Sequence, residues 1–69
     1  MSDEQIADAR ARYVTFLETR LKGHKAANER FPGTFPQSFF DDSQTEIDAI
    51  KGGKDVNWAM VQTRMGAGA

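Results

Sequence analysis

Cysteine is absent from this 69-residue sequence, histidine occurs once, and no long apolar run is present. Without cysteine the chain forms neither a disulfide nor a thiolate metal site, and one histidine alone does not build a structural zinc centre. A membrane-spanning helix needs about 18 or more consecutive apolar residues. We therefore expect no metal, no cofactor and no insertion into a membrane.

The first residues, Met-Ser-Asp-Glu-Gln, lack the basic segment and apolar core of a secretory signal. We expect a cytoplasmic protein, or a virion protein if the chain is encoded by a phage. Residues 1–69 are long enough for one small domain. A chain of this size buries only about 60% of its unfolded surface and is usually reinforced by a disulfide, a metal or a partner. With the first two disfavoured, a partner chain is the expected reinforcement, although a well-packed monomer remains open.

The charged residues are balanced and interspersed. Nine Lys and Arg stand against ten Asp and Glu, which gives a formal net charge of −1. No dense basic patch is present of the kind that binds nucleic-acid phosphates or anionic membranes. Nucleic acid is therefore a poor candidate partner.

Residues 3–30 are predicted to form one long amphipathic helix. They contain no proline, and an apolar stripe recurs at helical spacing, at Ile6, Ala9, Tyr13, Phe16, Leu17 and Leu21. Ser2 with Gln5 matches a capping box at the start of this helix. Gly23 leaves two alternatives: a continuous helix to about Arg30, which we favour, or a kink at Gly23.

An aromatic and proline-rich connection follows the long helix. The segment Phe31-Pro32-Gly33-Thr34-Phe35-Pro36 stops a helix, and Gly33 after Pro32 indicates a turn. Phe39 and Phe40 come next in the sequence. Because Phe39 and Phe40 are adjacent, we expect one of them to point away from the surface on which the other packs.

Two short helices complete the predicted all-α fold. Ser43 and Glu46 match a second capping box, which predicts a helix over 43–51 that ends at Gly52-Gly53. Asp55 is the expected cap of a third helix over 55–65. The third helix has apolar residues on two sides, so it needs two surfaces to cover it. We expect the glycine- and alanine-rich tail 66–69 to have no anchor.

The sequence contains no complete motif for catalysis, phosphate binding or calcium binding. His24 is the only residue that titrates near neutrality, but no spacing gives it an acid partner. Lys51-Gly52-Gly53-Lys54 lacks the spacing of a phosphate-binding loop and reads as a helix stop and turn. The acidic residues 41–48 lack the pattern of a calcium loop. We therefore predict that the protein is not an enzyme.

The aromatic residues are the best candidates for function, because aromatic side chains dominate the energetics of interfaces. The predicted partner-binding residues are Phe31, Phe35, Phe39, Phe40 and Trp58. Packing of these residues in the chain's own core is the alternative interpretation. We expect a structural or assembly subunit of a larger protein complex, of the kind found in phage virions or among bacterial accessory proteins. An inhibitor of one enzyme and a helix-turn-helix-like nucleic-acid binder are the alternative functions.

Overall fold

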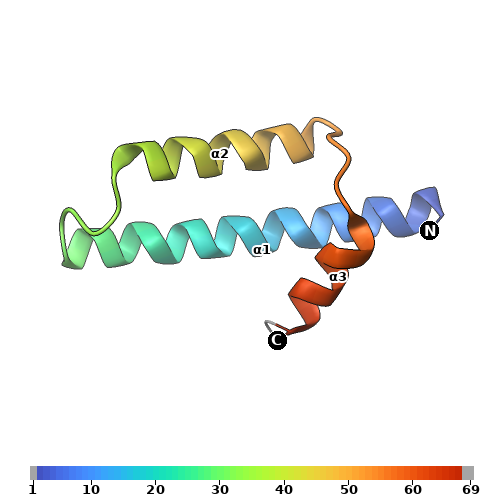
Figure 1. The fold of residues 1–69 in the computed structure, drawn as a ribbon, viewed down its shortest axis with the longest axis horizontal. Helices are drawn as coiled ribbons and strands as arrows, with labels where there is room; N and C mark the ends of the chain where they lie inside the picture. Colours follow the sequence, from blue (N-terminus) through green and yellow to red (C-terminus); the bar gives the residue numbers. More distant parts are fainter. Residues whose placement is uncertain (1, 68–69) are drawn as a thin grey trace.

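The apolar stripe of the first thirty residues lies on one uninterrupted helix. In the computed structural model, which describes residues 2–67, α1 runs from Asp3 to Arg30. The predicted capping box is confirmed, because the Ser2 hydroxyl accepts from the Gln5 amide at 3.2 Å and the Gln5 side chain accepts from the Ser2 amide at 2.9 Å. The helix passes through Gly23 without a break (Figure 1). The continuous helix that we favoured is thus confirmed.

A tight turn reverses the chain after α1. The Thr34 amide donates to the Phe31 carbonyl at 3.2 Å, and Gly33 has φ = +87°. Proline followed by a glycine with positive φ is the pattern of a type II turn. The Phe35 amide then donates to the Asn28 side chain at 3.1 Å. This hydrogen bond links the segment after the turn to the last turns of α1.

The second helix, α2, begins earlier than predicted and runs from Gln37 to Lys51. The expected start at Ser43 is wrong: Ser43 lies inside the helix, and its hydroxyl donates to the Phe39 carbonyl at 2.8 Å. Pro36 occupies the N-cap position without a side-chain cap. The early start places Phe40 in the core, and this burial stabilises a first turn that has no cap.

The third helix, α3, runs from Trp58 to Ala67, later than the predicted 55–65. Asn57, rather than Asp55, caps it, because the Asn57 side chain accepts from the Met60 amide at 3.2 Å. The predicted stop at Gly52-Gly53 is confirmed, since α2 ends at Lys51 and Gly53 takes a positive φ of 108°. Of the tail expected to lack an anchor, residues 66–67 belong to α3, and residues 68–69 lie outside the described residues.

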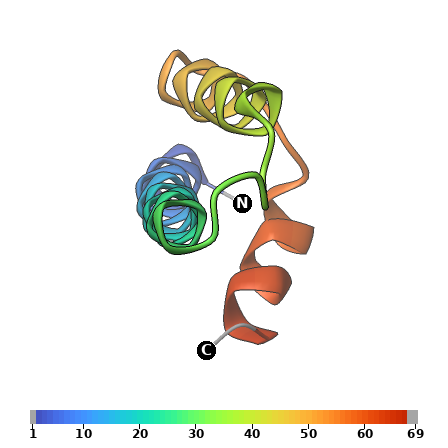
Figure 2. The same cartoon turned by 90° about the vertical axis from the view of Figure 1, so that its left-hand side faces the viewer.

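The helices form an antiparallel pair with a crossing third helix. Residues 2–67 contain three helices and no strand, as the predicted all-α fold requires. Figure 1 shows α2 returning alongside α1, and α3 crossing the N-terminal half of α1. Viewed from the end, α3 projects out of the plane of the other two helices (Figure 2). None of the helices in the described range has the length and apolarity needed to cross a membrane.

The core lies along the inner face of α1. The dimensions of 43 × 25 × 14 Å describe an elongated, thin molecule whose longest dimension is set by α1. Ile47 and Ile50 of α2 are the most completely buried large side chains, at 1% and 0% exposure. The other buried members of the core are Ala9, Tyr13, Val14, Leu21, Phe40, Trp58 and Val61.

Candidate functional site

The five aromatic residues predicted to bind a partner lie in three different environments. Phe31, at the turn after α1, is 68% exposed. Phe35 and Phe39 are half-buried against the core. Phe40 and Trp58 are 8% and 7% exposed, so in this conformation they are core residues with little surface left for another chain.

Phe39 and Phe40 do not diverge in the way that their adjacency suggested. Their rings contact one another edge to face, with centroids 5.5 Å apart. Phe35 stacks on Phe39 at 4.9 Å, and the His24 ring lies 4.9 Å from Phe35 and 5.2 Å from Phe39. One aromatic cluster thus joins the connection and α2 to the C-terminal half of α1. The His24 imidazole packs against two phenyl rings and borders the surface.

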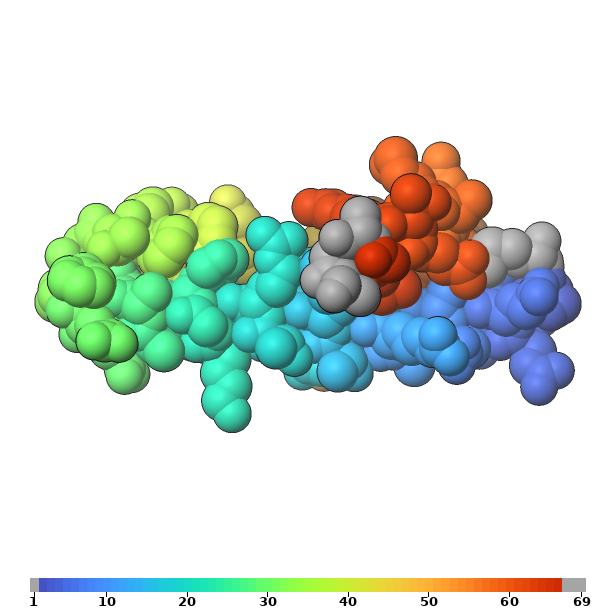
Figure 3. Space-filling view, turned by 90° about the horizontal axis from the view of Figure 1, so that it is seen from below, coloured from blue at the N-terminus to red at the C-terminus, as the bar shows by residue number. Residues whose placement is uncertain are grey.

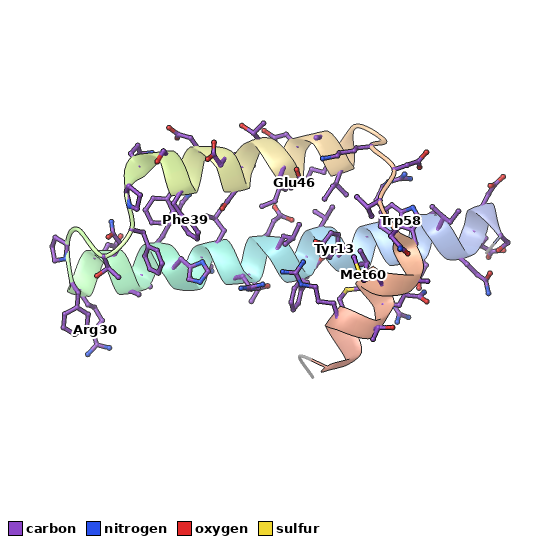
Figure 4. All side chains as sticks on the ribbon, viewed as in Figure 1. Tyr13, Arg30, Phe39, Glu46, Trp58 and Met60 are labelled. Atoms are coloured by element: carbon purple, nitrogen blue, oxygen red, sulfur yellow. The ribbon has the colours of Figure 1, made fainter. Side chains whose placement is uncertain are left out.

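Beside this cluster, an open groove of about 370 Å³ runs between α1 and α2. We call it the α1–α2 groove. The α1 wall comes from successive turns of the helix, and the α2 wall includes Phe39 and Glu46, which project from α2 toward α1 (Figure 4). Its lining consists of Leu17, Arg20, Leu21, His24, Phe39, Asp42, Ser43, Glu46 and Ile47. The lining is mainly apolar, with charged groups along both rims.

The two rims carry opposite charges. Arg20, on the α1 rim, places its guanidinium 5.6 Å from the centre of the Phe16 ring. Asp42 and Glu46 stand on the α2 rim. Glu46 is paired with Lys54 at 3.1 Å, whereas Asp42 forms no ion pair with any residue in the described range. The groove therefore suits an apolar group flanked by charges of both signs.

The groove lies on the same side of α1 as α3. Leu17 is one turn beyond Tyr13, and His24 is two turns beyond Leu17, so all three lie along one face of the helix. Tyr13 belongs to the core cluster that includes Trp58 and Val61 of α3. Seen from below, α3 stands out from α1 on the same side as the first turns of α2 (Figure 3). The fold thus covers part of this face of α1 with α3 and leaves the part beside α2 open.

The packing of α3 on α1 buries two polar atoms that have no hydrogen-bond partner among residues 2–67. The Arg10 guanidinium lies 5.2 Å from the Trp58 ring centre, and it is 3.8 Å from the exposed carboxylate of Asp55. Arg10 Nε and Trp58 Nε1 are both buried and have no hydrogen-bond partner in the described part of the chain. A buried donor without an acceptor costs about 1–3 kcal/mol, so this packing is not optimal.

Three other charged residues, Asp41, Asp48 and Lys51, form contacts that support the fold. Asp41 accepts a hydrogen bond from Gln37 at 3.0 Å, and Asp48 accepts one from Gln44 at 3.0 Å. Lys51 pairs with Glu18 across the two helices at 3.4 Å. No group of three or more potential metal ligands occurs within residues 2–67. The Lys51–Glu18 pair joins α1 to α2, whereas the bonds of Asp41 and Asp48 lie within α2.

Sequence reasoning found Phe39 but missed most of the α1–α2 groove. Leu17 and Leu21 belong to the predicted apolar stripe, yet the opposite wall of the groove depends on where α2 begins. The spacing of Phe40, Ser43 and Ile47, three and four residues apart, is the signal that predicts the earlier start. Comparison of the chain with known protein families, with curated proteins and with solved structures gave no match.

Proposed function

We propose that this chain is a non-enzymatic, protein-binding subunit that serves as a small structural or assembly component of a larger complex. The single observation that carries the proposal is the α1–α2 groove, an apolar surface that α3 leaves uncovered. Two large apolar side chains outside the groove are also exposed, Phe31 at 68% and Met60 at 65%. Contiguous exposed apolar surface marks sites of interaction with other proteins.

The shape of the chain gives further support. Protein domains usually pack two layers of secondary structure around one core. This molecule is elongated, at 43 × 25 × 14 Å, and α3 packs on α1 beside a groove that stays open between α1 and α2. Burial of this groove against another chain would complete the layer that α3 begins. We propose that Phe31 and Phe39 contact the partner directly, and that Phe35, Phe40 and Trp58 hold the surface in shape.

The surroundings of His24 favour binding over catalysis. A general base needs a group that orients it and a substrate site within hydrogen-bond reach. The His24 ring instead packs on Phe35 and Phe39. In this arrangement the imidazole contributes to a packed aromatic surface, as expected of a docking site.

Native mass spectrometry of the chain purified from its source organism tests the proposal. We expect the 7.7 kDa chain to travel with a companion protein at a fixed copy ratio. Phe39→Ala should release the companion, because it removes a ring from the groove wall. Lys22→Ala is the matched control: Lys22 is exposed and lies on the opposite side of α1 from Arg20, so this variant should keep the companion.

Two outcomes would argue for other roles. Recovery of the chain only as a free 7.7 kDa species would contradict the proposal. A one-to-one complex with a single enzyme whose activity is blocked would instead favour the inhibitor hypothesis. Helical circular dichroism of the Phe39→Ala protein must stay close to that of the parent, so that loss of binding is not confused with loss of fold.

A further inference from the structure

We infer that the α1–α2 groove accepts one short amphipathic helix from another protein, laid across α1 beside α3. The inference deepens the proposed function and rests on it. It specifies the shape and the charge pattern of the partner segment. Three features of the molecule lead to it: the way α3 is seated, the width of the open surface, and the charges on the rims.

First, α3 already packs on this face of α1, so it shows what kind of segment the face can bind. It is a helix of 10 residues, and it contributes Trp58 and Val61 to the core, with Met65 packed against them. These residues are three and four positions apart, which is the spacing of one helix face. The groove continues the same face of α1 through Leu17 to His24. A second helix with the same apolar spacing would find the same kind of surface.

Second, the open surface is one helix wide. From Leu17 to His24 the axis of α1 rises by ~10 Å, at ~1.5 Å per residue. A helix with its side chains has a diameter of about 10–12 Å. A helix that crosses α1 beside α3 therefore fits the open stretch. The open volume of about 370 Å³ has room for a few apolar side chains from such a helix.

The position of α3 also distinguishes a single helix from a second copy of this chain. α3 projects out of the plane of α1 and α2 (Figure 2), on the side where the groove opens. A flat approach by another α1–α2 pair would meet α3 before it reached the floor of the groove. A single helix is narrow enough to reach the groove without meeting α3.

Third, the rims define the two ends of the partner helix, because a helix that crosses α1 has one end toward each rim. Arg20 stands on the α1 side and Asp42 on the α2 side, both exposed. The complementary helix carries an acidic residue toward Arg20 and a basic residue toward Asp42, with apolar residues between them. The adjacent carboxylate of Glu46 already has Lys54 as its partner at 3.1 Å, so Asp42 is the better site for a new contact.

Two designed peptides test the inference against the full chain. Both are alanine-based helices with leucines spaced along one face; the first carries glutamate near its N-terminus and lysine near its C-terminus, and the second has these two residues exchanged. Each is titrated into the isotopically labelled full chain, and amide shifts are followed by NMR. We expect one peptide to bind more tightly, with shifts confined to residues 17–24 and 39–47. The preference should be about two- to fivefold, as for two exposed ion pairs.

Charge reversal on the protein makes the test specific. In the double variant Arg20→Glu with Asp42→Lys, the preference between the two peptides should invert. The matched control is Lys22→Glu with Asp41→Lys, which makes the same changes of charge at exposed positions that do not line the groove. The control should keep the original preference. All four substitutions are at exposed helix positions, where most changes have small effects on stability.

Several results would overturn the inference. These are the absence of shifts with either peptide at millimolar concentration, shifts centred away from the groove, or a preference that the charge reversal leaves unchanged. Sedimentation of the free chain as a dimer that Arg20→Glu disrupts would assign the groove to a second copy instead. If a companion is found by native mass spectrometry while both peptides fail to bind, the proposed function stands and only this inference fails.

Discussion

Replacement of Trp58 measures how much the packing of α3 against the core contributes to the stability of the fold. Trp58 is 7% exposed and is the only tryptophan in the chain. Trp58→Ala should destabilise the protein by about 3–5 kcal/mol, the usual range for removing a buried large aromatic side chain. Typical stabilities of about 0.05–0.15 kcal/mol per residue give about 3–10 kcal/mol for 69 residues. We therefore expect this variant to lose a large part of its stability.

Trp58→Phe separates packing from the unpartnered indole N–H. The smaller ring loses about 1 kcal/mol of apolar burial. Loss of a buried donor without an acceptor gains about 1–3 kcal/mol in return. After the added cost of imperfect packing, the net change should be within about 1 kcal/mol.

Urea unfolding followed by helical circular dichroism gives both free energies of unfolding. The reasoning fails if Trp58→Phe is as damaging as Trp58→Ala, because the indole N–H would then contribute a favourable interaction. It also fails if Trp58→Ala costs less than about 1 kcal/mol, since α3 would then add little to the core.

The same unfolding assay checks three further predictions. Gly23→Ala should stabilise the protein by about 0.5–1 kcal/mol, because Gly23 is helical and no atom of residues 2–67 lies within 4 Å of the added Cβ. Gly53→Ala should destabilise the protein by about 1 kcal/mol or more, because Gly53 has φ = +108°. Ser2→Ala should cost about 1 kcal/mol through loss of the capping box, while Ser43→Ala should change stability by no more than about 0.5 kcal/mol, since Ser43 is inside a helix. Asn57→Ala should cost about 1 kcal/mol and reduce the helical signal of α3; an unchanged stability would show that the cap does not matter.

The long helix could be predicted from the sequence because all its local signals agree. The capping residues, the apolar spacing and the absence of proline each indicate a helix over the same range. Gly23 costs only about 1 kcal/mol at an exposed position, which the rest of α1 can absorb. Its continuity could therefore be favoured before the fold was known.

The boundaries of the short helices could not be predicted in this way, because tertiary packing decides them. Ser43 and Glu46 match a capping box, but burial of Phe40 against the core makes the longer helix more favourable. At α3, both Asp55 and Asn57 are good caps by type. Seating of Trp58 in the core selects Asn57.

The candidate site was predictable only in part for the same reason. The aromatic residues indicated the region of the α1–α2 groove, because Phe39 lines it. The burial of each ring could not be predicted, because it depends on how α1 and α2 pair. Phe39 and Phe40 are neighbours with different exposures, since Phe40 is in the core and Phe39 borders the groove. The charged rims, Arg20 and Asp42, are far apart in the sequence, and only the return of α2 along α1 brings them to one groove.

Covalent footprinting of the chain in its native complex tests most directly whether the α1–α2 groove is the docking surface. Hydroxyl radicals modify aromatic and histidine side chains according to their exposure, and an amine-reactive reagent does the same for lysines. We predict that His24 and Phe39 lose reactivity when the complex forms, while Lys22 on the far side of α1 keeps its reactivity. Unchanged labelling of His24 and Phe39 together with protection of Lys22 would contradict the account.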